Sequence, residues 1–598
     1  MFYKPLGVHA VVNWPRLGFP HHHSIPLPLF PQPWRVKMQL VICNNLLNMS
    51  ASIPQHLAEP IALWLLGILV HLGLFIRGEW HLQAPIIVVN HFLAILVLFF
   101  FKHQQESSGI KQCLPVVGID TAAYLSGLLG SISIYRLFFH RLRAFPGPRL
   151  AALTKLWHVW KCRGSQGHHV LEDWHKKYGS IVRTGPNELT LFHPSAFEAL
   201  DGPRSRNTRS DWYDLLHPRI SSIFTRDQGM HKDRRKLWEK IMIASSVAQY
   251  YESILVKVRA LEDIISQSGS EALLVNDLIY FFAFDSMGAF GFGLDFGLMR
   301  DRKPIDGFRY MRSALGLLGP FTPAIWIARL GFSCIPGLWK VRHWFNMLKF
   351  SDNLMNTCMK SSPTKSESTQ AYIASAFIEE YKRSGAGKVS ERLLSGDGAN
   401  LLVAASDSTA PSIIFLLYFL AKYPEHAFRI REELKAVDHE DVRALSALPH
   451  LTGTINEALR LLPAIPTAVS RNTPPEGLMF DSVFIPGGVK ICAPRYSIGR
   501  LEEAFENPHD FVPERWYSKP EMVKAPRAFA PFGMGRTLCV GKNLAMAQMR
   551  LVAAAILPKY DIDFAPGEGN GEAVERDLKD QLTANPGKLR LVFAKRGS

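Results

Sequence analysis

Cysteine is scarce in this chain of 598 residues: there are seven, widely spaced, and no two form a Cys-x-x-Cys pair. A sparse, odd-numbered set in a long chain is typical of reduced thiols rather than of a disulfide framework. The sequence also lacks a glycine-rich nucleotide-binding fingerprint, a long Lys/Arg block and an internal repeat. Any nicotinamide or flavin chemistry would therefore come from a separate protein, and no motif indicates nucleic acid.

The composition indicates a folded chain with a basic excess. Hydrophobic residues make up 47% and charged residues 20%, which excludes a disordered protein. The net charge is +16, from 68 basic and 52 acidic residues. Beside long hydrophobic runs, this excess favours an anionic membrane surface and an acidic redox partner over nucleic acid.

Dense apolar runs are confined to the first quarter of the chain. Residues 61–76 and 84–101 are almost wholly apolar, and each ends at a basic residue. A weaker third run covers residues 116–139 and contains Asp120. The sequence predicts two or three membrane-spanning helices here, because a helix satisfies its own backbone inside lipid. Buried core helices remain the alternative, most of all for the third run.

Three segments follow from this pattern. Residues 1–48 carry three adjacent histidines among prolines and predict a low-order extension, with a metal-binding tract as the alternative. Met38 and Met49 are alternative start residues. An artefact of the gene model is therefore an alternative interpretation of part of this segment. Residues 49–144 form the predicted membrane anchor. The Phe-Pro-Gly-Pro stretch at 145–148 is a stiff elbow, and residues 145–598 form the predicted catalytic domain.

The catalytic segment predicts a mainly α fold with a small β region. Helical periodicity is clear at 401–423 and 544–557, and short β-type runs occur at 181–183, 189–192 and 489–492. A Ser/Thr/Lys-rich stretch at 361–369 predicts a surface loop.

One cysteine stands out by its surroundings. Cys539 closes the sequence Phe-Gly-Met-Gly-Arg-Thr-Leu-Cys, which starts at Phe532 and is followed by a glycine and a predicted helix. Glycines such as Gly533 allow the backbone to approach a flat ligand closely. A helix N-terminus favours a thiolate over a thiol, and a thiolate is a ligand for iron. A buried structural cysteine is the alternative interpretation of this pattern alone.

Two further motifs precede Cys539. Glu457 and Arg460 are three residues apart, on one face of a helix where they can pair. The stretch Phe-Val-Pro-Glu-Arg-Trp then supplies Arg515, 24 residues before Cys539. In this order the motifs resemble the cytochrome P450 signature set, over roughly residue 145 to the C-terminus.

The resemblance implies a cytochrome P450 fold that binds haem b, with Cys539 as the axial ligand to the iron. It also implies a structural ion-pair network behind the haem, formed by Glu457, Arg460 and Arg515. Electrons would come from NADPH through a separate cytochrome P450 reductase. The implied partners are a small organic substrate, that reductase and membrane lipids, with no nucleic acid.

The family's distal helix carries a small-small-x-Asp-Thr-Thr element, and residues 404–409 match it. Asp407 matches the Asp of this element, and Ser408 takes the place of its first Thr. Ala405 replaces a glycine. The resemblance gives Ser408 the alcohol that supports proton delivery, with Asp407 beside it. Thr409 is the alternative alcohol, although a regular helix would turn it about 100° away from Ser408. Ordinary back-bonding of the hydroxyls within the helix is the structural alternative.

Further haem contacts are implied at the propionates. His231 and Arg235 resemble the family's helix beside the propionates, and Arg471 matches the arginine at the haem edge. Arg536 lies three residues before Cys539 instead of the usual two, so its contact with a propionate stays open. Phe532 and Gly533 complete the implied haem-binding set.

The predicted function is a haem-thiolate monooxygenase that inserts one oxygen atom of O2 into a small organic substrate. Resemblance to fungal members favours secondary metabolism, at the endoplasmic reticulum membrane with the catalytic domain facing the cytoplasm. One alternative is a P450-fold isomerase, lyase or dehydratase that needs neither O2 nor reductase. Another is a non-catalytic haem-binding membrane protein.

Overall fold

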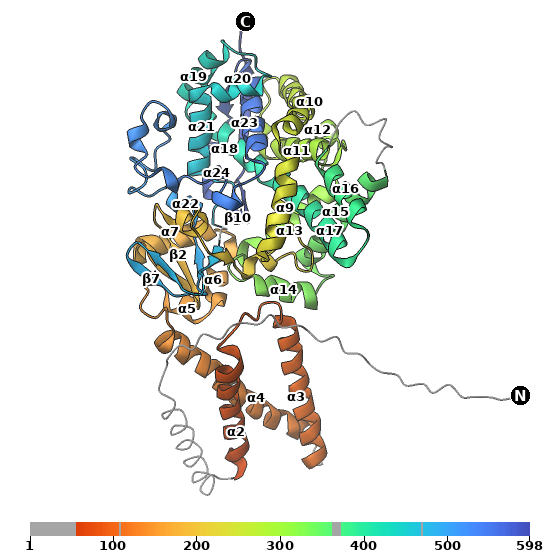
Figure 1. Cartoon of the computed structure of the whole chain (residues 1–598), viewed down its shortest axis with the longest axis vertical. Helices are drawn as coiled ribbons and strands as arrows, with labels where there is room; N and C mark the ends of the chain where they lie inside the picture. Colours follow the sequence, from red (N-terminus) through yellow and green to blue (C-terminus); the bar gives the residue numbers. More distant parts are fainter. Residues whose placement is uncertain (1–54, 107–108, 361–371, 468–469, 598) are drawn as a thin grey trace, which may run out of the picture.

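The computed structural model describes residues 55–106, 109–360, 372–467 and 470–597. A mainly helical body stands above three apolar helices that project from one of its ends (Figure 1). The predicted fold class, mainly α with a small β region, is confirmed. The predictions for residues 1–48 and for a loop at 361–369 lie outside the described residues.

The projecting helices are α2 (Gln55–Val70), α3 (Ala84–Glu106) and α4 (Ile110–Ile134). α2 and α4 continue into single π-helical turns, at His71–Phe75 and Tyr135–Phe139. Their apolar windows are only 11%, 0% and 28% buried, although each is long enough to cross a membrane. A soluble surface would not present so much apolar area, which is consistent with association with a membrane. The predicted apolar helices are therefore confirmed, including the third.

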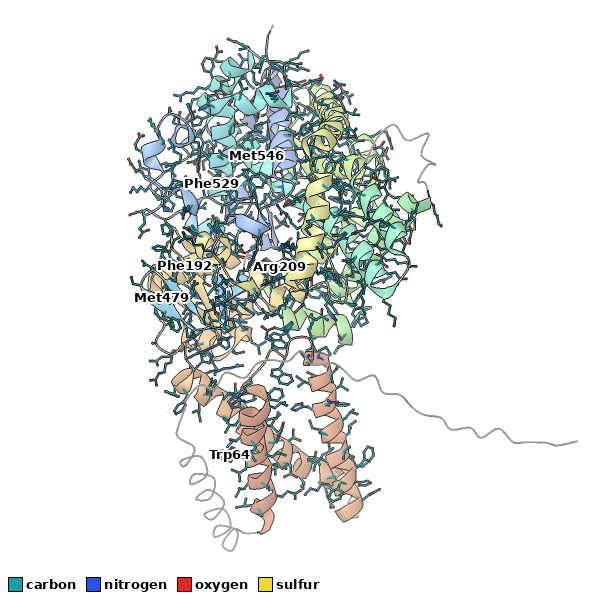
Figure 2. The ribbon with its side chains drawn as sticks, in the orientation of Figure 1. Trp64, Phe192, Arg209, Met479, Phe529 and Met546 are labelled. Carbon is teal, nitrogen blue, oxygen red and sulfur yellow. The ribbon has the colours of Figure 1, made fainter. Side chains whose placement is uncertain are left out.

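A close helix crossing holds α2 against α4. A Cβ atom at Gly67 would lie 2.2 Å from the carbonyl oxygen of Tyr124, and one at Gly127 would lie 2.0 Å from that of Trp64. Only glycine fits at both positions, as is common where helices pack inside a membrane. Trp64 of α2 is labelled in Figure 2 and is one of the exposed apolar side chains of the projecting helices.

The loop between α2 and α3 attaches the projecting helices to the body. Arg226 donates to both carboxylate oxygens of Glu79, at 2.5 and 3.1 Å. His81 Nε2 lies 2.7 Å from the Asp214 carboxylate. The short apolar helix α14 (Ile325–Cys334) lies at the same end of the body, beside α3 (Figure 1). Polar contacts therefore fix which end of the body faces the apolar helices.

The helices of the body pack around an extensive apolar core. Those that surround the site or support it are α9 (Gln228–Ile241), α10 (Ala244–Ser268), α11 (Val275–Met287), α13 (Asp306–Phe321), α15 (Trp339–Lys360), α16 (Ile373–Ser384), α17 (Lys388–Asp407), α18 (Thr409–Lys422), α19 (Pro424–Leu434), α21 (Pro449–Leu461) and α23 (Lys542–Ile556). Shorter helices are α5 (Arg149–Leu153), α6 (Lys155–Lys161), α7 (Gly167–Tyr178), α8 (Ala196–Asp201), α12 (Leu298–Asp301), α20 (Val442–Ala447), α22 (Arg495–Ile498) and α24 (Ala573–Arg576).

The strands gather mainly at the side of the body nearest the projecting helices (Figure 1). A five-stranded sheet has the order β1-β2-β8-β5-β3, in which only β2 and β8 pair in parallel. Its strands are β1 (Ile181–Gly185), β2 (Glu188–Leu191), β8 (Lys490–Cys492), β5 (Ser470–Asn472) and β3 (Thr208–Arg209), so the three predicted β-type runs are confirmed. The smaller sheets are β4-β12-β9 (Leu273–Leu274, Arg590–Lys595, Tyr560–Phe564), β6-β7 (Leu478–Phe480, Val483–Ile485) and β10-β11 (Lys579–Gln581, Thr583–Asn585).

The helix through the centre of the core is divided where the sequence predicts one continuous helix. Residues 388–422 are apolar enough to cross a membrane but are 78% buried in the body, so they form a core helix pair. α17 ends at Asp407 and α18 begins at Thr409, so the helical segment predicted at 401–423 is confirmed, with a break at Ser408. The hydroxyl groups of Ser408 and Ser412 bond to carbonyls four residues back, which weakens and bends a helix at such a point.

Candidate active site

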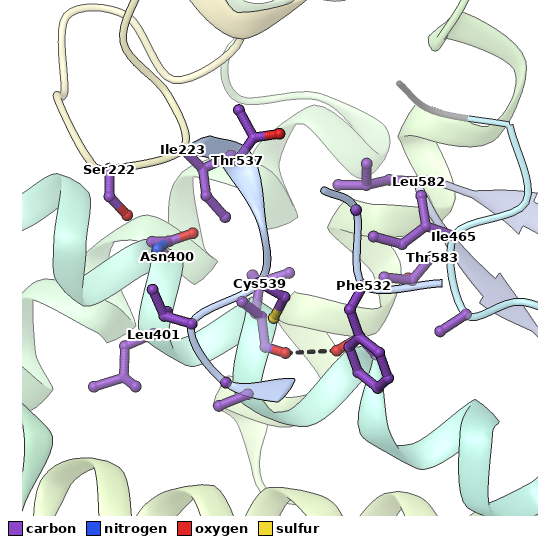
Figure 3. Close-up of a pocket in the computed structure, with 18 of the residues that line it drawn as sticks. Ser222, Ile223, Asn400, Leu401, Ile465, Phe532, Thr537, Cys539, Leu582 and Thr583 are labelled. Atoms are coloured by element: carbon purple, nitrogen blue, oxygen red, sulfur yellow. Dashed lines mark hydrogen bonds between the residues drawn. The ribbon is translucent and has the colours of Figure 1, made fainter. Parts of the chain in front are cut away.

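A cavity of about 370 Å³ lies inside the body, between α9, the α17–α18 break and the loop that carries Cys539. Figure 3 shows Cys539 and Phe532 of that loop together with Asn400 and Leu401 of α17. Leu582, between β10 and β11, and Thr583, the first residue of β11, also contribute to the wall. Segments that are far apart in the sequence thus enclose one space.

The Cys539 loop is a tight turn in front of α23. The backbone N–H of Cys539 donates to the carbonyl of Phe532 at 2.8 Å, which closes the loop. Gly533 and Gly535 have φ angles of +74° and +57°, and a Cβ at Gly535 would lie 2.1 Å from the Asp201 carbonyl oxygen. Both positions therefore require glycine. Cys539, Phe532 and Gly533 all line the cavity, and α23 begins three residues after the cysteine.

The electrostatic environment of the Cys539 thiol has two opposing parts. Burial raises its pKa, and this effect is larger than the opposing effects of the backbone groups of Gly541 and Lys542 and of the charges on Arg235 and Arg495. The sequence predicts a thiolate at this helix start. The N–H groups and cations therefore favour the thiolate only in part.

Glu457, Arg460 and Arg515 form one buried ion-pair network. Both oxygens of the Glu457 carboxylate accept from Arg460, at 2.7 and 2.9 Å, and Arg515 Nε donates to Oε1 at 2.9 Å. Trp516 Nε1 donates to the same carboxylate at 2.9 Å, as does the backbone N–H of Val512 at 3.0 Å. The remaining guanidinium protons go to backbone carbonyls, including those of residues 499, 506 and 508. The network ties α21 to the segment that leads to the Cys539 loop.

Ser408 and Thr409 both line the cavity, at the break between α17 and α18. Ser408 Oγ donates to the Ala404 carbonyl at 2.7 Å, and Thr409 Oγ1 donates to that of Ala405 at 3.3 Å. The expectation that Thr409 faces elsewhere is wrong, because the helix is not regular at this point. Each hydroxyl keeps free lone pairs that can accept a hydrogen bond from a molecule in the cavity.

Asp407 is fully buried and is not among the residues that line the cavity. Its carboxylate accepts from Arg312 of α13 at 2.7 Å and from the hydroxyl of Thr583. Burial raises the pKa of Asp407, and Arg312 opposes the shift. Thr583 itself lines the cavity, so it connects the acid with that space. No local sequence pattern indicates this contact, because Thr583 lies 176 residues away from Asp407.

Cationic side chains gather at one edge of the cavity. His231 and Arg235 of α9 and Arg471 of β5 line it, whereas Arg536 is not among the lining residues and donates to the Asn207 carbonyl. Arg471 is held by both oxygens of Asp201, at 2.7 Å each. Arg235 pairs with Glu239 and also donates to the Leu538 carbonyl beside Cys539.

Two further arginines at this edge have no counterpart among the predicted site residues. Arg209, which is labelled in Figure 2, lines the cavity, and burial lowers its pKa to about 10. Burial also lowers the pKa of Arg495 to about 10. Arg495 Nε donates to the Ala530 carbonyl at 2.8 Å, but its Nη1 is buried without a hydrogen-bond partner among the described residues. The signal that could have indicated Arg495 is an arginine inside the otherwise buried stretch 493–498.

A buried guanidinium nitrogen without a partner, such as Arg495 Nη1, indicates a place for an anionic ligand. The donor set therefore fits a haem: a thiol on one wall for the iron, and uncompensated cations at the edge for the carboxylates of the ring. The fold and the site together indicate a haem protein with a cysteine available to the iron.

Comparison with known proteins identifies the family. The family model for cytochrome P450 matches residues 146–593. Cytochrome P450 monooxygenase sthD of Phaeosphaeria nodorum is 34% identical over 477 residues, which cover 79% of this chain and 99% of the relative. Cytochrome P450 monooxygenase phqL of Penicillium fellutanum is 32% identical over 89% of this chain and 94% of its own. Tryprostatin B 6-hydroxylase of Aspergillus fumigatus is 30% identical over 84% of this chain and 90% of its own.

The chain belongs to the cytochrome P450 family and is a haem-iron enzyme of the monooxygenase class. The two alternatives, a P450-fold isomerase, lyase or dehydratase and a non-catalytic haem-binding protein, are therefore disfavoured.

Proposed function

We propose that this enzyme inserts one atom of O2 into a small organic substrate, with electrons that pass from NADPH through a separate reductase. The observation that carries the proposal is that Cys539 and the hydroxyl groups at the α17–α18 break line the same buried cavity. Cys539 would hold the iron of a haem bound there, and the hydroxyl groups of Ser408 and Thr409 would be available to substrate and O2.

Each group at the site has a proposed role. Haem b supplies the oxygen-activating chemistry, and Cys539 holds its iron. Arg471, His231, Arg235 and the unpaired Arg495 hold the propionates, whereas Arg536 supports the loop through the Asn207 carbonyl. Ser408 holds the water that delivers protons, with Thr409 as the competing alcohol. Asp407 acts through Thr583, because its carboxylate lies outside the cavity wall.

The substrate is proposed to be a small apolar molecule of fungal secondary metabolism. The cavity wall contains mainly apolar side chains, among them Phe290, Leu315, Trp344, Met347 and Leu582. Such walls favour compounds with large apolar surfaces, with a few polar groups to orient them. One relative by sequence is named Tryprostatin B 6-hydroxylase, and a name that denotes hydroxylation of an organic compound supports a substrate of this kind.

The proposed setting is the endoplasmic reticulum membrane, with the catalytic domain in the cytoplasm. We propose that residues 49–144 anchor the chain and that residues 145–598 form the catalytic domain. The elbow at 145–148 follows the last apolar helix directly. An anchored enzyme and an anchored reductase would meet by diffusion in one plane, and the basic net charge of +16 favours an acidic partner.

The test combines a spectrum with turnover. The reduced carbon monoxide complex of the full-length protein should absorb at about 450 nm, and Cys539→Ala should lose that band. With a reductase, product formation should require both NADPH and O2. If Cys539→Ala keeps the band, the ligand assignment is wrong. If substrate is converted equally well without NADPH and O2, the enzyme is an isomerase, lyase or dehydratase.

A further inference from the structure

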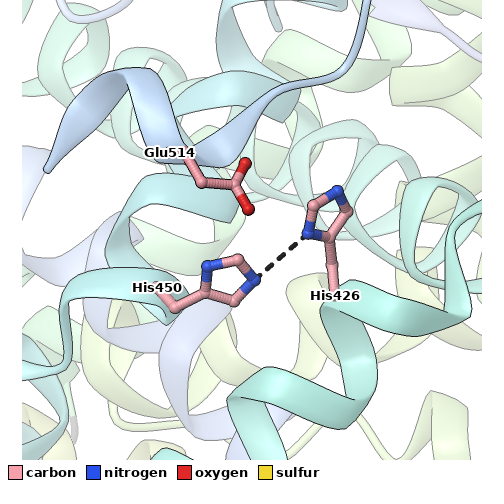
Figure 4. A group of neighbouring side chains, drawn as sticks. All are labelled: His426, His450 and Glu514. Carbon is pink, nitrogen blue, oxygen red and sulfur yellow. Dashed lines mark hydrogen bonds between the residues drawn. The ribbon is translucent and has the colours of Figure 1, made fainter. Parts of the chain in front are cut away.

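A second cluster of possible metal ligands lies outside the haem cavity. His426 of α19, His450 of α21 and Glu514 of the 3₁₀ turn Pro513–Trp516 point toward one another (Figure 4). The two imidazoles are buried, and the Glu514 side chain is 13% exposed. His426 Nδ1 lies 3.2 Å from His450 Nε2, and the three ligand atoms all lie within 4.8 Å of one another.

We propose that His426, His450 and Glu514 bind a zinc ion. Tetrahedral zinc lies about 2.1 Å from nitrogen and oxygen ligands, which places neighbouring ligand atoms about 3.4 Å apart. The 3.2 Å between the two ring nitrogens already matches this spacing. The partly exposed Glu514 carboxylate completes the set by a small side-chain rotation, and water takes the fourth position. Two imidazoles and one carboxylate suit zinc better than calcium or magnesium, which prefer oxygen ligands.

The surroundings of the two rings support metal binding. His450 Nδ1 lies 2.9 Å from the Tyr517 hydroxyl, and His426 hydrogen-bonds to the backbone of Phe511. Partners of this kind orient a ring whose other nitrogen binds a metal.

Two interactions compete with the metal. Without zinc, one histidine donates to the other across the 3.2 Å gap. Arg429 pairs with the Glu514 carboxylate and places a positive charge near the site. The Arg429 side chain is 52% exposed, so it can turn into solvent at little cost when a cation replaces it.

A bound zinc would act on the supports of the haem site without touching the haem. Glu514 precedes Arg515 directly, and His450 lies two turns before Glu457 on α21. The ion would therefore clamp the two segments that carry the buried ion-pair network, and α19 as well. The proposed role is structural, and it does not depend on the proposed reaction.

The test measures zinc in full-length protein made without a polyhistidine tag. The parent and all variants carry His21→Ala, His22→Ala and His23→Ala, because that histidine run could bind zinc by itself. Each protein is loaded with ZnCl2, passed through gel filtration and analysed for zinc by mass spectrometry. Glu514→Gln is the decisive variant, because it removes the anionic ligand and leaves the histidine pair in place. His439→Gln, at another histidine of the same region, is the matched control, and circular dichroism checks folding.

The expected result is about one zinc per chain in the parent and in His439→Gln, with loss of zinc in Glu514→Gln and His450→Gln. Arg429→Gln should bind zinc at least as tightly as the parent, since the carboxylate is released from its pair. Cobalt in place of zinc should give the visible absorption of a tetrahedral site in the parent, in His439→Gln and in Arg429→Gln, but not in Glu514→Gln or His450→Gln. A parent that retains no zinc, or variants that retain it equally, would overturn the proposal and leave a hydrogen-bonded histidine pair.

Discussion

Ser408 is the residue whose hydroxyl is best placed to serve the cavity. It lies at the helix break, and its Oγ donates to the Ala404 carbonyl while its lone pairs remain available. Ser408→Ala should reduce product formation by about 10²-fold or more, while NADPH and O2 are still consumed and peroxide is released. Ser408→Thr should restore coupling, because a branched side chain has fewer rotamers.

The control for this prediction is Thr409→Ala, measured with the same substrate and reductase. Thr409 also lines the cavity, but it is only 4% exposed. Its substitution should change coupling less than Ser408→Ala does. If Thr409→Ala uncouples the reaction and Ser408→Ala does not, the roles of the two alcohols are exchanged.

Arg495 offers a second prediction at the scale of single residues. Its Nη1 is buried without a partner among the described residues, at the edge of the haem cavity. A charged hydrogen bond to a propionate is worth roughly 1.5–3 kcal/mol, so Arg495→Leu should weaken haem binding by about 10-fold or more. Titration of the protein with haem, followed by its absorption, measures the change. Arg527→Leu, at an exposed arginine, should bind haem like the parent.

At the scale of elements, Asp580 makes the position of β10 sensitive to pH. Its backbone N–H donates to the Ser165 carbonyl at 2.6 Å, and Thr467 donates to its Oδ2. The other carboxylate oxygen is buried without a partner among the described residues. Burial raises the pKa of Asp580 from 3.8 to about 7, since the charged form loses its hydration.

The sign of the effect follows from proton binding. The folded chain holds this proton more tightly than the unfolded chain, so the free energy of unfolding decreases as the pH rises from about 4 to about 7. Asp580→Asn removes this part of the pH dependence of the free energy of unfolding. The variant should match the parent near pH 4 and be more stable at pH 8, by roughly 1–4 kcal/mol. Thermal unfolding at pH 4, 6 and 8 measures this, with Asp563→Asn on the exposed face of β9 as the control. A pH dependence identical in Asp580→Asn and parent would contradict it.

At the scale of the whole molecule, the outward-facing apolar helices predict tight association with membranes. Full-length protein should pellet with microsomes and resist extraction by high salt and by alkali. Deletion of residues 1–144 should release much of it. The apolar helix α14 and the exposed side chains of Leu338 and Trp339 lie at the same end of the body and should retain a fraction.

A pair of substitutions separates the contribution of residues 1–144 to membrane association from that of the apolar end of the body. In the deleted protein, Leu338→Ser together with Trp339→Ser should abolish the remaining sedimentation, because about 2 kcal/mol or more of apolar burial is lost for each side chain. The same pair of substitutions in the full-length chain should have no visible effect. Extraction of the full-length protein by alkali would rule out spanning helices.

The sequence by itself determined the features that depend on local order. The apolar runs, the short strands and the start of α23 follow from the pattern of neighbouring residues, as does the glycine turn before Cys539. The pairing of Glu457 with Arg460 is equally local, because three residues of helix bring the two side chains together.

The tertiary structure alone decided which side chains enter the cavity. Asp407 is turned away from it by Arg312, 95 residues earlier, and by Thr583, 176 residues later. Arg495 lies at the cavity because the turn after β8 packs beside the Cys539 loop. The zinc-like spacing of His426 and His450 arises from the packing of α19 against α21. Contacts between distant segments leave no trace in local periodicity, because they depend on how whole elements fill the core against one another.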